Sequence, residues 1–212
     1  MIGARMARPG EESELRALWT AVFGDEPEYL DTYFRELYAP ENVRVIEADG
    51  RIVSAAHIVF FGSRRYIYAV ATYPEYRGRG YGRAVVLAAA DGRPAYLAPA
   101  EPSLFRWYRE SVGAEVCDCF APTEPEETLT PLTPEEYMTR REELLRGVPH
   151  AEYTPGILRC FGEYGSFFAG REHIYAMEDG RVMECVPPPP GGEPYVMALF
   201  GGEALHWGLT LI

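Results

Sequence analysis

The sequence contains no lysine, and its 20 basic residues, all arginines, are outnumbered by 32 aspartates and glutamates. The formal net charge is −12 at pH 7. Proteins that bind nucleic acids or anionic membranes do so through clusters of lysine and arginine. We therefore expect neither a nucleic acid nor a membrane as a partner. An acidic surface is compatible with a cationic amine substrate, and equally with solubility alone.

Long hydrophobic runs are also missing. The longest runs, at residues 58–61 and 84–90, are far shorter than the roughly 20 residues that a membrane-spanning helix needs. The first residues include arginines but lack the apolar core of a secretory signal. From these absences we expect a cytoplasmic protein.

Cysteine and histidine are scarce, with 4 residues of each type. A reducing cytoplasm keeps cysteines as thiols, so we expect no disulfide framework. Cys117 and Cys119 are separated by a single residue, whereas zinc sites use wider spacers and a second pair or nearby histidines. We therefore expect no metal. The other members of the two sets show no triad or metal spacing: Cys160, Cys185, His57, His150, His173 and His206.

Residue patterns in the first 120 positions predict a mixture of helices and strands. Apolar residues recur at helical spacing over residues 11–23 and 28–38. The dipeptide Asp49-Gly50, which is favoured in tight turns, lies between β-rich runs at 43–47 and 51–61 and predicts a hairpin. Further on, the patterns predict strands at 66–73, 95–98 and 114–120 and helices at 80–90 and 102–111.

Composition changes at residues 121–135, which are rich in proline, threonine and glutamate and resemble a linker. Thr133 can cap a helix over residues 134–146, with proline at its first position. We therefore expect one domain at 1–120 and a small α+β domain, mainly antiparallel, at 136–212. Its β-rich segments are 157–161, 167–168, 173–177, 181–186, 195–200 and 205–212.

The segment R-G-R-G-Y-G-R at residues 77–83 follows a predicted strand and precedes a predicted helix. Glycines let backbone N–H groups turn toward a ligand, and a helix N-terminus carries positive dipole, so the segment suits a pyrophosphate. A glycine-rich turn with solvated arginines is the alternative. The glycine spacing does not fit a Rossmann fold, and a Walker A loop requires a lysine.

The stretch V-A-T-Y-P-E-Y-R-G-R-G-Y-G resembles the signature of the GNAT superfamily of N-acetyltransferases, whose core element R/Q-x-x-G-x-G/A matches Arg77, Gly80 and Gly82. Residues 96–113 resemble a later part of that fold, where a strand and a helix lead to a tyrosine shortly before a glycine. The resemblance covers about residues 2–120, and the whole chain is similar to an uncharacterised bacterial branch with an extra C-terminal domain.

The resemblance implies an α/β (α+β) fold, with a mixed central sheet flanked by helices and a smaller β-rich C-terminal domain. It implies acetyl-CoA as a co-substrate and no metal. Main-chain groups of Val70, Ala71 and Thr72 would bind the pantetheine arm like an added strand. The residues implied to hold the pyrophosphate are Arg77, Gly78, Arg79, Gly80, Tyr81, Gly82 and Arg83.

Catalysis, on this resemblance, would depend on Tyr108, which aligns with the tyrosine that protonates the departing CoA thiolate in many members. Four residues separate Tyr108 from Gly113 where most members have three, so the helix end differs. The alternative for Tyr108 is packing beside Trp107. Glu101 is the first candidate for the general base, and helix capping is the alternative for that side chain.

Two further acidic features remain open. A related multidomain branch uses its terminal carboxylate as the base, which in this chain would be that of Ile212. The carboxylates of Asp25, Glu26 and Glu28 lie in a region that often borders the acceptor site, where they would suit a cationic amine or form a solvated loop.

The sequence therefore predicts an N-acetyltransferase that moves an acetyl group from acetyl-CoA to a primary amine by direct attack. The acceptor would be a small molecule or a peptide whose identity the sequence leaves open. The alternatives are a non-catalytic module that binds CoA or acyl-CoA, and an assembly module whose C-terminal unit forms a homodimer.

Overall fold

The computed structural model describes residues 3–121 and 123–209. Within these residues, seven strands form one sheet in the order β1-β2-β3-β4-β5-β11-β6, and four strands form a second sheet in the order β10-β9-β8-β7. None of the helices in the described residues has the length and apolarity that crossing a membrane requires. The first part of the chain contributes β1 (Arg5–Met6), α1 (Glu12–Phe23), α2 (Pro27–Glu36), β2 (Val43–Ala48), β3 (Arg51–Phe61), β4 (Arg64–Thr72), α3 (Tyr81–Ala90), β5 (Ala95–Leu97), α4 (Pro102–Val112) and β6 (Glu115–Phe120).

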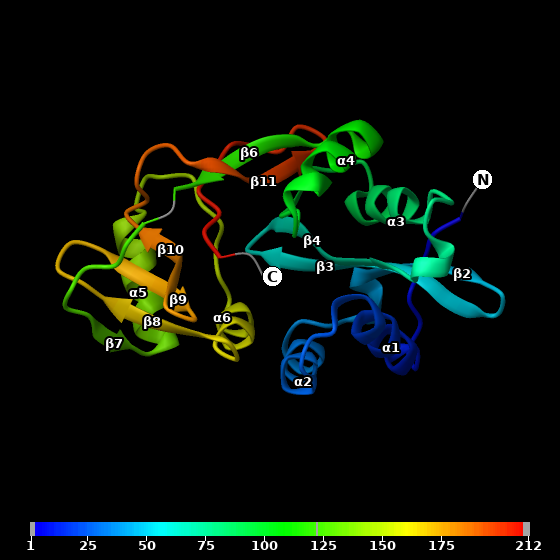
Figure 1. The fold of residues 1–212 in the computed structure, drawn as a ribbon, viewed down its shortest axis with the longest axis horizontal. Coiled ribbons are helices and arrows are strands. Elements are labelled where there is room, and N and C mark those ends of the chain that lie inside the picture. Colours follow the sequence, from blue (N-terminus) through cyan, green and yellow to red (C-terminus); the bar gives the residue numbers. More distant parts are fainter. Residues whose placement is uncertain (1–2, 122, 210–212) are drawn as a thin grey trace.

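Helices cover both faces of the seven-stranded sheet. Figure 1 shows α1 and α2 on one side of β3 and β4, with α3 and α4 on the other. Amphipathic spacing explains this placement, because Leu15, Leu18 and Trp19 share the buried face of α1. On the opposite side, Val85, Val86 and two alanines bury the apolar face of α3. The predicted hairpin is confirmed, since β2 and β3 pair antiparallel around Asp49 and Gly50.

The second sheet belongs to a smaller unit built from β7 (Thr130–Leu132), α5 (Pro134–Leu144), α6 (Pro155–Phe161), β8 (Gly165–Ala169), β9 (Ile174–Glu178) and β10 (Arg181–Val186). All of its strand pairs are antiparallel, as predicted. The predicted cap of α5 is confirmed, because Thr133 Oγ1 accepts from the Glu136 N–H and the Glu136 carboxylate accepts from the Thr133 N–H.

Strand β11 (Glu193–Leu199) leaves the smaller unit and returns to the large sheet, where it pairs antiparallel with both β5 and β6. We predicted one domain at 1–120 and another at 136–212, but β11 belongs to the large sheet of the first part of the chain. The four-stranded sheet is therefore inserted in the sequence between β6 and β11. A close backbone approach marks the return. A side chain at Gly192 would collide with the backbone of Phe120, so only glycine fits there.

Two predicted β segments have other structures. Residues 157–161 were predicted as β-rich, but they lie in α6, which begins at Pro155 and is capped by Thr154 Oγ1 accepting from the Ile157 N–H. The cap and the proline at the first turn favour a helix over a short apolar strand. The prediction of a strand at 205–212 is also wrong over residues 205–209, which are the part that the structure describes. These residues form no strand and make a single β-bridge, between His150 and His206.

A buried ion pair between α5 and β10 of the smaller unit also contacts the C-terminal segment. The side chains of Arg141 and Glu184 are fully buried, and Arg141 Nε donates to Glu184 Oε1 at 2.9 Å. Although burial raises the pKa of Glu184, Arg141 and His206 favour its charged form strongly enough to lower that pKa to about 2. Tyr137 and Tyr153 also donate to the same carboxylate, and Arg141 donates to the carbonyls of Ala151 and Trp207.

Replacing Glu184 by glutamine is therefore expected to destabilise the protein strongly. The isosteric amide removes the buried counterion of Arg141 and leaves it with the more exposed Glu142 carboxylate at 3.5 Å. Losing one partner of a buried ion pair typically costs about 3–5 kcal/mol. The exposed pair Arg106–Glu110 supplies the matched control, and Glu110→Gln is expected to change stability by less than about 1 kcal/mol. Denaturant unfolding measures both variants, and equal small losses would contradict the importance of the buried pair.

Candidate active site

The site begins where β4 and β5 separate. These neighbouring strands run parallel and pair at Arg65 with Ala95 and at Tyr66 with Tyr96. Strand β5 then ends at Leu97, and the chain turns away through Pro99. Over the described residues, β4 therefore continues to Thr72 without a strand partner on this edge. An unpartnered strand edge presents backbone N–H and C=O groups to an extended ligand.

A β-bulge lies on the part of β4 that pairs with β3 but no longer pairs with β5. Along β3, Ala55 is opposite Ala71 and His57 is opposite Tyr68, so β4 has one extra residue between these pairs. Within the bulge, Ala69 has a φ of 46°, in the left-handed region that residues other than glycine seldom occupy. Such bulges bend a strand and redirect its backbone groups. The bulge therefore distorts β4 at the point where it separates from β5.

The predicted arginine-glycine loop connects β4 to α3. Gly78 and Gly80 adopt left-handed φ values of 75° and 81°, which explains the need for glycine at both positions. Helix α3 begins at Tyr81, and no side chain caps it. The N–H groups of its first turn are therefore available to an anion that the helix dipole also favours.

A cavity of about 640 Å³, here named the loop cavity, lies against this helix start. Eight of the ten predicted cofactor residues line it: Val70, Thr72, Arg77, Gly78, Gly80, Tyr81, Gly82 and Arg83. Arg77 and Arg83 supply positive charge while donating to the carbonyls of Thr72 and Ser111 at 3.2 and 2.8 Å. The loop cavity thus combines an uncapped helix start, two guanidinium groups and an open strand edge.

The other two predicted cofactor residues do not line the loop cavity. Ala71 is only 3% exposed and packs in the hydrophobic core that contains α1 and α2. Arg79 donates to the carbonyl of Glu75 and lies over the ring of Tyr76, at 5.0 Å from its centroid. The guanidinium of Arg79 is therefore engaged by Glu75 and Tyr76, and although Tyr76 lines the loop cavity, Arg79 does not.

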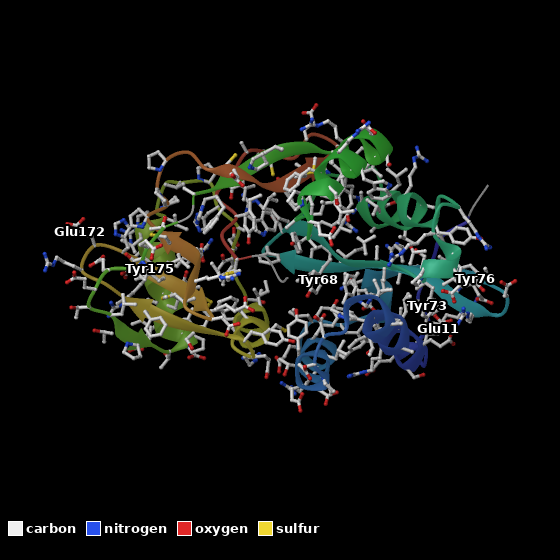
Figure 2. The ribbon with its side chains drawn as sticks, viewed as in Figure 1. Glu11, Tyr68, Tyr73, Tyr76, Glu172 and Tyr175 are labelled. Atoms are coloured by element: carbon white, nitrogen blue, oxygen red, sulfur yellow. The ribbon has the colours of Figure 1, made fainter. Side chains whose placement is uncertain are left out.

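A second cavity, of about 370 Å³, adjoins the loop cavity at the gap between β4 and β5. We name it the aromatic cavity because Trp19 and Phe23 of α1, Tyr66 and Tyr68 of β4, Tyr108 of α4 and Tyr195 of β11 line it. Figure 2 shows Tyr68 near the middle of the molecule. Its hydroxyl forms a hydrogen bond of 2.6 Å with the Tyr29 hydroxyl of α2, which fixes the ring against the helices.

The two cavities share five lining residues, namely Phe23, Val70, Ala100, Leu104 and Tyr108. Tyr108 contributes a phenol hydroxyl, which can act as a proton donor, at this junction. Its side chain is 7% exposed, and burial raises its pKa to about 12. Its ring packs edge-on against Trp107 at 4.8 Å, but its hydroxyl forms no hydrogen bond with the described residues. The hydroxyl is therefore protonated at neutral pH and has its hydrogen available for a ligand.

Carboxylates lie at both cavities. Glu101 lines the loop cavity from the exposed start of α4, where it does not cap the helix and accepts from Ser103 Oγ at 3.3 Å. Asp25 lines the aromatic cavity, whereas Glu26 and Glu28 are exposed and do not line it. Ile212, the other candidate base, lies outside the described residues. The described residues contain no group of three or more His, Cys, Asp or Glu suited to a metal ion.

The aromatic cavity contains residues that the sequence placed only within a predicted helix and a predicted strand. Tyr66 and Tyr68 are two positions apart on a strand and so share a face, and Trp19 fits the apolar stripe of α1. These patterns predict burial and give no sign of a cavity. No sequence pattern indicated that Tyr195 belongs to the site. Tyr195 reaches the cavity because β11 inserts into the large sheet between β5 and β6.

Comparison with known proteins identifies the fold. Residues 4–109, half of the chain, match the model of the acetyltransferase (GNAT) domain family. No curated protein matches the sequence. A solved protein from Pyrococcus horikoshii, assigned as an acetyltransferase, has 13% identity and a TM-score of 0.59, with 96% of this chain and 90% of that chain covered.

Two GCN5-related N-acetyltransferases have similar folds. The one from Kribbella flavida has 17% identity and a TM-score of 0.58, with 87% of this chain and 56% of that chain covered. The one from Anabaena variabilis has 18% identity and a TM-score of 0.54, with 86% and 53% covered. This chain therefore spans about half the length of these two proteins. With half of its length matched by the family model and the same fold in solved relatives, the chain belongs to the GNAT acetyltransferase family.

Proposed function

We propose that this protein is an N-acetyltransferase that binds acetyl-CoA in the loop cavity and a primary amine in the aromatic cavity. The observation that carries the proposal is the junction of the two cavities at Tyr108, beside the gap between β4 and β5. Family membership supports acyl transfer in general.

The features of the loop cavity support CoA as the donor. Its uncapped helix start and the guanidinium groups of Arg77 and Arg83 suit a pyrophosphate. The free edge of β4 from Val70 to Thr72 can pair with the amides of a pantetheine arm as an added strand. A CoA held in this way would direct its thioester toward the junction, where Tyr108 lies.

The proposed reaction is a direct displacement. The neutral amine nitrogen attacks the thioester carbonyl carbon, forming a C–N bond, and the C–S bond then breaks to release the CoA thiolate. The thiolate takes the proton of the Tyr108 hydroxyl, and the nitrogen loses a proton to a base. Glu101, which lines the loop cavity, is the proposed base, directly or through water. Proton exchange with solvent restores both groups.

Replacing Tyr108 by phenylalanine is expected to lower kcat by about 100-fold or more, which is typical of the loss of a general acid. The hydroxyl has no hydrogen-bond partner among the described residues, so the fold loses none of their hydrogen bonds. Steady-state kinetics across an amine panel measures the effect. The KM for acetyl-CoA is expected to stay within about twofold of wild type, since the acid acts on the leaving sulfur.

Tyr175→Phe, which removes a hydroxyl in the smaller unit, is the matched control and should leave kcat unchanged. Because the pKa of Tyr108 is about 12, this group sets no alkaline decline of kcat below about pH 11. Wild-type turnover in Tyr108→Phe would remove the assigned acid. CoA binding without turnover on any amine would instead favour the non-catalytic module.

Replacing Arg83 by glutamine is expected to weaken CoA binding about tenfold or more, the usual effect of losing a charge-assisted contact to phosphate. Arg79→Gln is the matched control from the same loop, because that guanidinium lies over Tyr76 and does not line the loop cavity. Calorimetric titration gives both dissociation constants, and CoA should also raise the melting temperature of wild type. Equal losses in the two variants would show that charge near the loop, rather than a specific contact, holds CoA.

A further inference from the structure

The aromatic cavity combines apolar walls with a single type of charge. Six aromatic side chains from α1, β4, α4 and β11 line it: Trp19, Phe23, Tyr66, Tyr68, Tyr108 and Tyr195. Among the described lining residues, Asp25 is the only carboxylate, and none is lysine, arginine or histidine. The loop cavity differs in this respect, because arginines line it. The two sides of the junction therefore favour ligands of opposite charge.

The position of Asp25 is fixed by the wall of the cavity. The indole Nε1 of Trp19 donates to Asp25 Oδ2 at 2.6 Å, and Trp19 itself is only 2% exposed. The other carboxylate oxygen, Oδ1, accepts no hydrogen bond from the described residues. A carboxylate that is anchored through one oxygen and open at the other is suited to a cationic donor.

The negative charge of Asp25 acts on the surrounding tyrosines. Burial raises the pKa of Tyr68 well above its ordinary value, and the neighbouring Tyr29 and Asp25 add to this effect. Burial likewise raises the pKa of Tyr29, with a further contribution from Asp25. Both hydroxyls are neutral at physiological pH, so the potential in this part of the cavity is set by the carboxylate and attracts a cation.

Size and surface chemistry narrow the class of cation further. A volume of about 370 Å³ falls in the lower part of the range of roughly 300–1,000 Å³ that small-molecule sites occupy. Aromatic faces bind an ammonium through their negative quadrupole and pack against other rings. A second ammonium on the ligand would be buried among these rings without a counterion, which is unfavourable.

We infer that the acceptor is an arylalkylamine, a primary ammonium joined by a short linker to an aromatic ring. Asp25 binds the ammonium and the aromatic walls bind the ring, and the ammonium loses one proton to solvent before its neutral nitrogen attacks the thioester. This inference rests on the proposed acetyl transfer, because the ligand must present its nitrogen at the junction beside Tyr108. Asp25 is thus a substrate-binding residue that distinguishes mono-cationic aromatic amines from polyamines.

Three probe acceptors test the inference by comparing kcat/KM with acetyl-CoA as donor. These are 2-phenylethylamine, which carries a ring and a charge, ethylamine, which carries the charge alone, and the polyamine spermidine. We expect 2-phenylethylamine to exceed each of the others by about tenfold or more, because its ring removes apolar surface from water when it enters the cavity. A preference for ethylamine or spermidine would overturn the inference and leave the acetyltransferase intact.

Variants of the cavity test the two contacts separately. Asp25→Asn keeps the shape and removes the charge, so it should raise the KM for 2-phenylethylamine about tenfold while the KM for acetyl-CoA is unchanged. Glu26→Gln, which alters the adjacent exposed carboxylate, is the matched control and should have an effect of less than twofold, roughly that of a surface charge. Phe23→Ala should reduce the ratio of kcat/KM for 2-phenylethylamine to that for ethylamine.

Calorimetric binding of 2-phenylethylamine to the CoA-saturated protein provides a readout that does not depend on turnover. Binding that is weakened by Asp25→Asn and not by Glu26→Gln supports the assigned site. Absence of binding to the CoA complex, or equal effects of the two variants, overturns it. If CoA itself does not bind, the proposed function fails, and this result is distinguished from failure of the acceptor assignment alone.

Discussion

The limited pairing of β4 with β5 is the constraint on which the rest of the site depends. Two residue pairs hold these parallel strands together before they separate. The bulge at Ala69 and the early end of β5 accompany the separation. Because the strands diverge within the large sheet, a gap reaches through its centre, and the loop cavity and the aromatic cavity meet there. Continuous pairing would have produced a closed sheet with no shared junction.

The strand that follows the inserted unit completes the large sheet. Strand β11 fills the space between β5 and β6 and brings Tyr195 to the aromatic cavity. The segment that follows places the fully buried ring of Trp207 on those of Tyr66 and Tyr96, at 5.2 and 4.8 Å. Tyr66 is thus packed from behind by residues that follow the insertion. The buried Arg141–Glu184 pair connects that same segment to the smaller unit, because Arg141 also donates to the Trp207 carbonyl.

Local signals predicted most helices and strands. The prediction failed at residues 157–161, where a local cap was not taken into account, and at β11, where distant pairings decide the sheet order. The hairpin at Asp49 and the cap at Thr133 depend on neighbouring residues, and both are present. Residues 157–161 contain apolar residues that suit a strand or a buried helix, and the cap at Thr154 selects the helix. The position of β11 was not predictable, because sheet order is a property of distant pairings that leave no local pattern.

The sequence by itself determined the loop at residues 77–83, since glycines at fixed spacing and the start of a helix are encoded within a few positions. It also indicated the family and named Tyr108. Only the tertiary structure decided which of the predicted cofactor residues, and which of the acidic residues between α1 and α2, line a cavity. It separated Arg83 from Arg79 and Asp25 from Glu26, because side chains close together in sequence point in different directions once the backbone folds. The aromatic cavity is likewise a tertiary property, assembled from α1, β4, α4 and β11, whose residues meet only when the sheet forms.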